Sequence, residues 1–267
     1  MVEIKIAIIG YGFVGQSFER MIQGHYQTLI YDPKKECSVD KDQINQCDLA
    51  VIAVPTPSLE DGGCDTSLVE ESVNWLRTPV ILIKSTVIPG TTDRLREKTK
   101  KRIVFSPEYI GEGKYQVSQR LSFQNDMSLT PFLILGGSEA DCNYVLDLLV
   151  PVLGPEKTYY KTKALEAELI KYMTNAYFCV KLTFMNEMYE ISKKLGADWY
   201  SVWQGFVLDP RVELMHTAIF PKSRGFSGKC LPKDIKALVK LSSNEGYQPE
   251  FLIQTIMSNS KFKGGED

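Results

Sequence analysis

The stretch "IAIIGYGFVG", residues 6–15, decides which class of fold this chain is expected to adopt. A run of apolar residues ends at Gly10, and Gly10, Gly12 and Gly15 then follow the G-x-G-x-x-G spacing. Glycines in this spacing allow a tight turn and let a pyrophosphate approach the N-terminus of a helix, where amide hydrogens and the helix dipole favour negative charge. The stretch therefore predicts a strand, a phosphate-binding turn and a helix.

An acidic residue completes this predicted dinucleotide site. The next predicted strand, "TLIYD", ends at Asp32, close to the roughly 20-residue distance at which such sites carry an acid. A carboxylate there can accept both ribose hydroxyls and repels a 2′-phosphate, which favours NAD over NADP. The alternatives are a glycine turn that serves packing only, and FAD. We assign to the NAD site Gly10, Gly12, Phe13, Val14, Gly15 and Asp32.

Short apolar runs alternate with helical segments as far as about residue 160, for example "LAVIAVP", "VILIKST", "RIVFSP" and "FLILGGS". This alternation predicts an α/β domain over residues 1–161, a Rossmann-like, doubly wound parallel sheet with helices on both faces. Ligands of such sheets bind beyond the carboxyl ends of the strands, where Ser85, Thr86, Glu108 and Glu112 follow two of the runs. Capping and turn formation are the alternative roles for these residues. A long, partly irregular connection is expected over 111–131.

The second half of the chain, residues 162–267, is predicted to be all helical. Residues 163–195 contain no Gly or Pro, and Gly196 is a suitable stop for one long central helix. Its apolar residues occupy much of its circumference, so we expect it to be buried on several sides, including against a second copy of itself. Shorter helices are expected at Asp198–Val207, Pro232–Asn244 and Pro249–Ser260.

Two residues of the long helix could take part in chemistry. Lys171 and Asn175 are four residues apart and share a face. A cation and an amide held together beside a nicotinamide would stabilise an alkoxide or an oxyanion. A solvated lysine with no chemical role is the alternative.

The stretch "RGFSGKCLPKD" offers a candidate nucleophile, Cys230. Pro232 fits the first turn of a helix, which places the sulfur near the positive end of the helix dipole, and Lys229 and Lys233 flank it. These features favour the thiolate, whereas Asp234 opposes it by charge but could position a water molecule or the lysine. An inert packing residue is the alternative, and it is our interpretation of the other five cysteines.

Composition limits the remaining functions. The chain has 267 residues, a formal charge of −2 and 43% hydrophobic residues, enough for one large domain or two ordinary ones. We expect no nucleic-acid binding, no membrane span and no metal site, because the charge is balanced, no apolar run is long enough and the cysteines are not closely paired. The start "MVEIKIAIIGYG" does not have the pattern of an apolar leader, so we expect a cytoplasmic location.

Together the motifs resemble the UDP-glucose/GDP-mannose dehydrogenase family over nearly the whole chain. They are "GYGFVG", "IAVPTP", "KSTVIPGTT", "SPEYIGEG", "LIKYMTNAYFCVKLTFMNEM" and "GFSGKCLPKD", in the family's order. The resemblance implies an NAD-dependent oxidation of a nucleotide sugar, such as UDP-glucose to UDP-glucuronate in polysaccharide biosynthesis. Two NAD molecules would act in turn, with Cys230 holding the intermediate first as a thiohemiacetal and then as a thioester.

The resemblance also implies roles for single residues. Lys171 and Asn175 would stabilise oxyanions, and Asp234 would assist water and lysine. Thr86, Glu108 and Glu112 would lie near the hydrolytic water and the nicotinamide. The implied cofactor contacts add Pro55, Thr56, Ser85, Thr86, Glu112 and Lys233, and the implied substrate contacts are Lys171, Asn175, Arg211, Gly225, Phe226 and Gly228.

Three departures from the family pattern stand out. Ser227 replaces the usual second glycine of the cysteine loop. Arg211, which would reach a neighbouring subunit's substrate in a homodimer built on the long helix, lies farther from Cys230 than in the family. The family's third domain, a Rossmann-like unit that helps bind the substrate's nucleotide, has no counterpart, so we expect a shortened chain or a natural minimal form. Lys222 and Arg224 could then supply phosphate contacts.

Two other functions compete with this one. A β-hydroxyacid dehydrogenase shares the glycine motif and the Lys-x-x-x-Asn helix but performs a single oxidation without a cysteine, and "GFSGKCLPKD" argues against it. The other is an NAD-binding module without catalysis, which the presence of all the catalytic residue types argues against.

Overall fold

The computed structural model describes residues 4–111 and 126–264. They form two compact units. The sheet unit contains the described residues up to 57, 64–111 and 126–171, and the helical unit contains 58–63 and 172–264. The units divide inside the long helix because its first turns pack on the sheet, and the boundary predicted after residue 161 stays a prediction.

The described strands of the sheet unit form one seven-stranded sheet in the order β2-β1-β3-β4-β5-β6-β7. The strands are β1 Lys5–Ile9, β2 Gln27–Tyr31, β3 Leu49–Ile52, β4 Val80–Ile83, β5 Ile103–Phe105, β6 Phe132–Gly136 and β7 Thr158–Thr162. Strands β1 to β5 pair in parallel, and β1 lies between β2 and β3. The chain therefore reverses its direction of winding after β2, and in sheets of this kind ligands bind at the carboxyl ends of the strands beside such a reversal, here β1 and β3.

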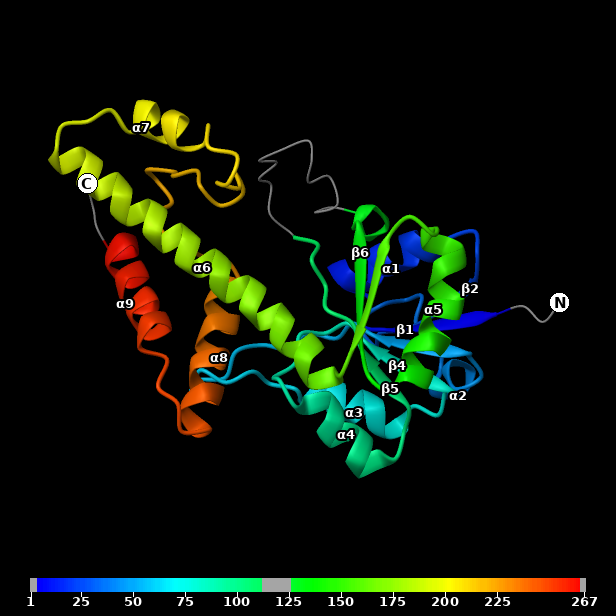
Figure 1. The fold of residues 1–267 in the computed structure, drawn as a ribbon. Coiled ribbons are helices and arrows are strands. Elements are labelled where there is room, and N and C mark those ends of the chain that lie inside the picture. The colour runs from blue at the N-terminus through cyan, green and yellow to red at the C-terminus, as the bar shows by residue number, and fades with distance from the viewer. Residues whose placement is uncertain (1–3, 112–125, 265–267) are drawn as a thin grey trace. The chain divides into compact units, whose positions relative to one another are not determined.

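Helices cover both faces of the sheet (Figure 1). One face packs on α1 and α5, and the other on α2, α3, α4 and the start of α6. The helices of this unit are α1 Phe13–Ile22, α2 Lys41–Ile44, α3 Ser67–Trp75, α4 Thr91–Thr99 and α5 Glu139–Leu153. Alternate residues of β1 serve the two faces: Ile6 and Ile8 belong to one core, and Ala7 and Ile9 to the other. The predicted α/β fold class is confirmed.

The last two strands differ from the prediction. β6 runs antiparallel to β5, with Phe105 opposite Gly136, and β7 is parallel to β6. An antiparallel neighbour needs no crossover helix, so β6 can begin at the edge where β5 ends. β7 was not predicted, because its sequence "TYYKT" is half exposed at the edge of the sheet and has no apolar run. Most of the irregular connection expected over 111–131 lies outside the described residues.

The long helix α6, Ala164–Lys194, is confirmed, and its first turns are fixed on the sheet unit. Gly136 allows this, because a Cβ there would lie 2.5 Å from the Cβ of Ala167. Glu168, fully buried, accepts hydrogen bonds from the amides of Gly90 (2.6 Å) and Thr92 (2.8 Å) at the start of α4. A carboxylate of α6 thus satisfies free amides at the N-terminus of α4.

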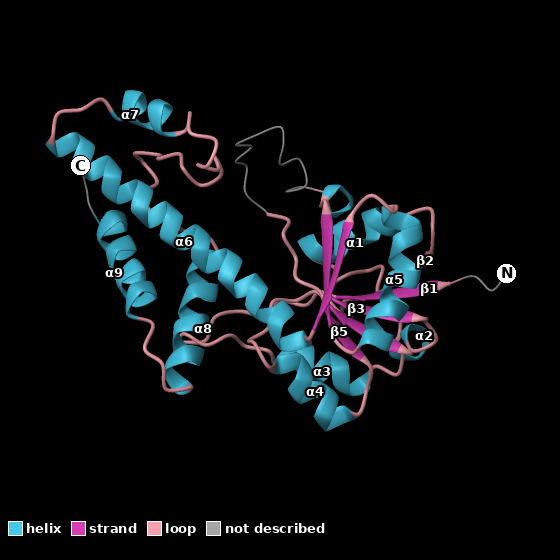
Figure 2. Ribbon diagram, in the orientation of Figure 1, coloured by secondary structure: helices cyan, strands magenta, loops and turns pink. Residues whose placement is uncertain are grey.

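The helical unit continues α6 with α7 Trp199–Phe206, α8 Leu231–Asn244 and α9 Glu250–Gly264 (Figure 2). These bounds agree with the predicted helices to within a few residues. Gly196 follows α6 with φ +70°, a left-handed conformation that suits glycine, so the predicted stop is confirmed. A small core of Cys179, Phe226 and Ile235 joins α6, the cysteine loop and α8.

Candidate functional site

The glycine turn after β1 is shaped by close main-chain packing. Gly10 has φ +88°, and a Cβ there would lie 2.8 Å from the carbonyl oxygen of Ala53 after β3. A Cβ at Gly15 would collide with the carbonyl oxygen of Gly10. By contrast, a Cβ at Gly12 would meet no described atom within 4 Å. Packing thus explains two of the three glycines, and Gly12 leaves open the space that a pyrophosphate would need.

The start of α1 is suited to an anion. Gly12 is its N-cap residue, its first turn carries no acidic residue, and Phe13 and Val14 begin the helix. Asp32 lies at the end of β2, where its Oδ2 accepts a hydrogen bond from the Tyr11 amide (2.9 Å). Its carboxylate is therefore fixed beside the glycine turn, where a dinucleotide's ribose would bind.

Hydroxyl groups connect the loops that follow β3 and β4. Thr56 Oγ1 donates to the carbonyl oxygen of Thr86 (2.8 Å), and Ser85 Oγ donates to that of Val54 (2.7 Å). Pro55 lies between these contacts in sequence and is exposed. The predicted cofactor residues Ser85 and Thr56 therefore first stabilise this edge of the sheet, and each hydroxyl can still accept a hydrogen bond.

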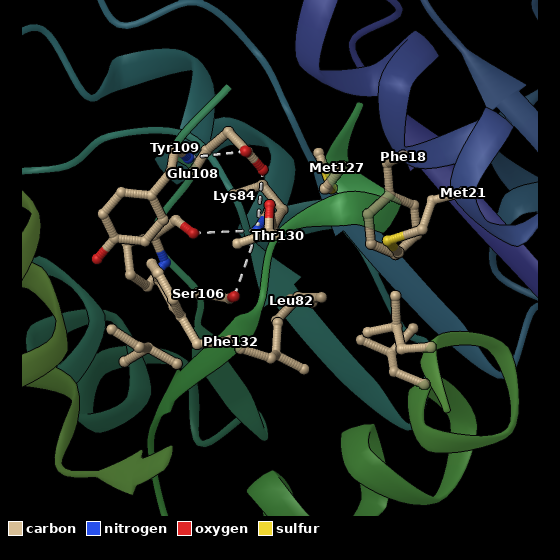
Figure 3. A pocket seen from close by; sticks show the side chains of 15 residues that line it. Phe18, Met21, Leu82, Lys84, Ser106, Glu108, Tyr109, Met127, Thr130 and Phe132 are labelled. Carbon is tan, nitrogen blue, oxygen red and sulfur yellow. Dashed lines mark hydrogen bonds and ion pairs between the residues drawn. The ribbon is translucent and has the colours of Figure 1, made fainter. Parts of the chain in front are cut away.

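A buried ion pair lies at the ends of β4 and β5, in a small pocket of the sheet unit (Figure 3). Lys84 Nζ is 3.1 Å from Glu108 Oε2, with only 4% and 8% of the two side chains exposed. The other oxygen of Glu108 accepts from the amides of Tyr109 and Ile110. Glu108 is thus committed to framework contacts, and the predicted partner Glu112 lies outside the described residues.

Lys171 reaches the same segment from α6. Its Nζ donates to the main-chain oxygen of Glu108 (2.5 Å) and lies 5.2 Å from the centre of the Tyr109 ring. The predicted catalytic lysine is therefore half buried and anchored.

In the helical unit a buried polar network begins on the next turn of α6. Asn175 Nδ2 donates to Asp234 Oδ2 (2.6 Å), and Lys233 Nζ is 2.7 Å from Asp234 Oδ1. Asn175 and Asp234 are both buried. The predicted cofactor residue Lys233 is thus an ion-pair partner of the predicted catalytic aspartate.

Cys230 is exposed and is the N-cap residue of α8, with the predicted Pro232 in the first turn. Burial raises the pKa of Cys179 to about 12 and those of Cys47 and Cys142 to about 11, which keeps these thiols protonated. The packing role predicted for the five other cysteines is wrong for Cys37, which lies exposed in a turn after β2.

The loop before Cys230 is held by side chains of α6 and α9. Asn259 Oδ1 accepts from the amide of Phe226 (2.6 Å), and its Nδ2 donates to the carbonyl oxygen of Phe226 (3.1 Å). Asn186 Oδ1 accepts from Arg224 Nε (2.7 Å) and from the Gly225 amide (3.1 Å). Two amide side chains thus provide hydrogen-bond partners for main-chain groups of this loop.

This arrangement gives structural contacts to two of the predicted substrate residues, whose substrate roles stay predictions. Phe226 was assigned to substrate, but its side chain is only 2% exposed and belongs to the core. Arg224 was expected to be available to phosphate, but its guanidinium pairs with Glu190 (2.8 Å) and lies over the Tyr189 ring. Both residues anchor the loop because its glycines cannot contribute packing.

Two of the other predicted substrate residues, Gly228 and Arg211, are exposed. Gly228 has φ +83° and no described atom near its Cβ position, and Gly225 has φ +71°. Arg211 is 88% exposed and pairs with Asp209 in its own loop. Their roles stay predictions.

Three functional candidates were missed in the sequence: Lys84, Asn186 and Asn259. Lys84 carried a signal, because it directly follows the four buried residues of β4. The two asparagines lie within helices and have no local pattern that points to a loop far along the chain.

The fold and the two sites define a dinucleotide-binding α/β protein joined to a helical unit that presents an exposed thiol. Residues 17–147 match the NAD-binding domain, and residues 165–261 the central domain, of the UDP-glucose/GDP-mannose dehydrogenase family. The chain belongs to this family, and the predicted cofactor, NAD, is confirmed.

Single relatives are similar to the chain over most of its length. The UDP-glucose 6-dehydrogenase AglM of Haloferax volcanii is 30% identical over 245 residues, which cover 83% of this chain and 54% of that protein. The chain spans about half the length of the curated relatives it matches. A UDP-glucose dehydrogenase structure from Pyrobaculum islandicum has a TM-score of 0.80 at 22% identity, covering 97% of this chain and 68% of that one.

A 3-hydroxyisobutyrate dehydrogenase from Mycobacterium tuberculosis shares the fold too. Its structure has a TM-score of 0.72 at 15% identity, covering 98% of this chain and 94% of that one. The fold alone therefore does not separate the two kinds of dehydrogenase. Within the described ranges, every helix lacks the length or the apolar character needed to cross a membrane.

Proposed function

We propose that the chain oxidises the primary alcohol of a nucleotide sugar to a carboxylate, using two NAD molecules in turn and Cys230 as the nucleophile. The observation that carries this proposal is the exposed thiol at the N-terminus of α8, on the helix whose next turn carries the buried Asp234. A single oxidation of an alcohol needs no thiol, whereas retention of an aldehyde between two oxidations does.

The sheet unit would hold the cofactor. The glycine turn offers the amides of α1 to the pyrophosphate, and Asp32 accepts the ribose hydroxyls. When bound, NAD supplies the acceptor for the hydride released at each of the two oxidations.

The helical unit would hold the reacting carbon. After the first oxidation, the Cys230 sulfur forms a bond to the aldehyde carbon and the oxygen takes a proton, which gives a thiohemiacetal. Loss of a second hydride and a proton gives the thioester. Water then adds to the carbonyl carbon and loses a proton, the carbon–sulfur bond breaks, and the acid is released while the Cys230 thiolate is restored. Lys171 and Asn175 stabilise the negative oxygen in these steps, and Asp234 orients Asn175.

The substrate we propose is UDP-glucose and the product UDP-glucuronate. Support comes from relatives named UDP-glucose 6-dehydrogenase, of which the chain spans about half. A uronate product would feed polysaccharide biosynthesis. A cytoplasmic location agrees with these reactants and stays a prediction.

We further propose a homodimer built on α6. Its large apolar side chains are exposed at intervals of four and seven residues, which form a stripe along one side of a helix. They are Leu165, Leu169, Met173, Tyr177, Phe184 and Ile191. A second copy would cover this stripe and bring Arg211 of each chain near the other's substrate. A monomer mass in light scattering would contradict the dimer.

The function is tested by counting NADH per sugar consumed, over a panel of UDP- and GDP-sugars. We expect about two NADH per sugar for the wild type, and at least a roughly 100-fold loss of acid product for Cys230→Ser. Cys37→Ser is the matched control, because Cys37 is also exposed but lies in the sheet unit. Cys37→Ser should keep the wild-type yield of about two NADH per sugar and of acid product.

The same count separates the alternatives. With a β-hydroxyacid added to the panel, one NADH per hydroxyacid and none from any sugar, unchanged in Cys230→Ser, would indicate a β-hydroxyacid dehydrogenase, whose fold this chain shares. NAD binding without NADH from any sugar or hydroxyacid would indicate a non-catalytic module and would overturn the proposed reaction.

A further inference from the structure

Lys84 is a buried cation, and its ammonium group contacts residues of one short segment, 106–108. Its Nζ donates to Ser106 Oγ (3.3 Å) and to the carbonyl oxygen of Pro107 (3.2 Å), and it pairs with Glu108 Oε2 (3.1 Å). The ammonium group thus donates two of its hydrogens to Ser106 and Pro107, and the Glu108 carboxylate compensates its charge. Figure 3 shows Lys84 between the side chains of Ser106 and Glu108.

Glu108 in turn holds the main chain of the two residues that follow it. Its Oε1 accepts from the amides of Tyr109 (2.7 Å) and Ile110 (2.9 Å), which bends the chain around the carboxylate. Its main-chain oxygen accepts from Lys171 Nζ (2.5 Å). The location of this carbonyl therefore depends on a carboxylate whose cation is Lys84.

We propose that Lys84 is a positioning residue: its ion pair with Glu108 fixes the turn 106–110 and thereby the carbonyl oxygen that anchors Lys171. The part of this proposal that concerns turnover rests on the proposed function, whereas the part that concerns the turn does not. Without Lys84, the Glu108 carboxylate would be a buried charge with no cation, and it would move toward water together with the turn.

The test is Lys84→Met, which keeps the length of the side chain and removes the charge. Amide hydrogen exchange of residues 106–111, followed by mass spectrometry, should become about 10-fold faster or more, while β1 and β3 keep their rates. NADH formation should lose about 100-fold in kcat, because a displaced Lys171 no longer meets the reacting oxygen. The Kd for NAD should change less than about threefold, since the glycine turn is untouched.

Lys101→Met is the matched control. Lys101 is a partly buried lysine whose Nζ donates to the carbonyl oxygens of Val73 (2.6 Å) and Asn74 (2.7 Å). It precedes β5, whereas Lys84 follows β4. Its loss removes similar bonds but should leave exchange at 106–111 and kcat unchanged. Lys84→Arg keeps the cation and should recover most of the kcat.

A double variant guards against loss of folding. If Lys84→Met does not fold, Lys84→Met/Glu108→Gln removes the uncompensated charge as well and should fold, with fast exchange at 106–111. Unchanged exchange in whichever variant folds would overturn the proposal. Fast exchange with an unchanged kcat would overturn its catalytic part. Fast exchange in a protein whose wild type oxidises no sugar would keep Lys84 as a positioning residue of the turn and would reject the proposed function instead.

Discussion

Two of the loops that lead into the N-terminus of a helix, the turn before α1 and the loop before α8, are held in opposite ways. The turn before α1 is fixed by main-chain packing, with Gly10 against Ala53 and Gly15 against Gly10. The loop before α8 is fixed by the side chains of Asn186 and Asn259. The turn before α1 should therefore be disrupted by substitutions that add a Cβ to a glycine. The loop before α8 should be disrupted by substitutions that remove an asparagine side chain.

The largest effect is expected from adding a methyl group to the first loop. In Gly15→Ala the Cβ collides with the Gly10 carbonyl oxygen, and neither group can move without shifting β1 or α1. We expect a loss of about 4 kcal/mol in the free energy of unfolding, or no folded protein at all. Urea denaturation measures it.

Gly12→Ala is the matched control, since its Cβ meets no described atom and its φ of −84° suits alanine. Stability should be unchanged or rise by up to about 1 kcal/mol, while NAD binds roughly 10-fold more weakly. If both variants lost stability equally, the open space at Gly12 would not be the reason for glycine there.

The second largest effect is expected from Glu168, a buried side chain of the sheet unit. Unlike the glycine turn, it makes stability depend on pH. Burial raises the pKa of Glu168 from its ordinary 4.5 to about 7. Between these values the folded chain binds more protons at Glu168 than the unfolded chain does, so the contribution to stability falls as the pH rises from about 4.5 to about 7. The expected loss is on the order of 3 kcal/mol.

Glu168→Gln should remove this slope, which is measured as the difference in unfolding free energy between wild type and variant from pH 5 to pH 8. Glu166→Gln is the control, because Glu166 is exposed on the same helix. A wild-type minus Glu168→Gln difference that stayed flat over this range would mean that Glu168 titrates normally in the folded chain.

The sequence predicted those features whose cause is local. The apolar runs of β1 to β6, the stop at Gly196 and the glycine turn each depend on neighbouring residues, and the fold class followed from them. The antiparallel direction of β6 was missed, because a strand's own residues do not encode which way its neighbour runs. β7 was missed because an edge strand buries little.

The candidate site shows the same difference between local features, which the sequence predicted, and contacts between distant residues, which it did not. Cys230, Pro232 and Asp234 lie within one short stretch and were found together, whereas the contacts of Asp234 with Asn175 and of Phe226 with Asn259 join residues far apart in the chain. The burial of the Phe226 side chain was likewise not visible in any pattern of residue types.

The smallest effect is expected from removing one side chain from the second loop. Asn259→Ala leaves the buried amide and carbonyl groups of Phe226 without partners, at a cost of about 2 kcal/mol. The loop before Cys230 then loosens, and the rate of Cys230 alkylation by iodoacetamide should change severalfold. Mass spectrometry of the labelled peptides separates Cys230 from the exposed Cys37.

Asn45→Ala is the control for Asn259→Ala, because it removes an asparagine side chain from the sheet unit. Asn45 bridges two main-chain groups in the same way, donating to the carbonyl oxygen of Trp75 (3.3 Å) and accepting from the Arg77 amide (2.6 Å). Because these two groups are less buried than those of Phe226, the substitution should cost about 1 kcal/mol. It should not alter Cys230. If both variants changed Cys230 alkylation equally, general loosening would explain the effect. If only Asn259→Ala did, the thiol depends on a side-chain clamp that the glycine turn does not need.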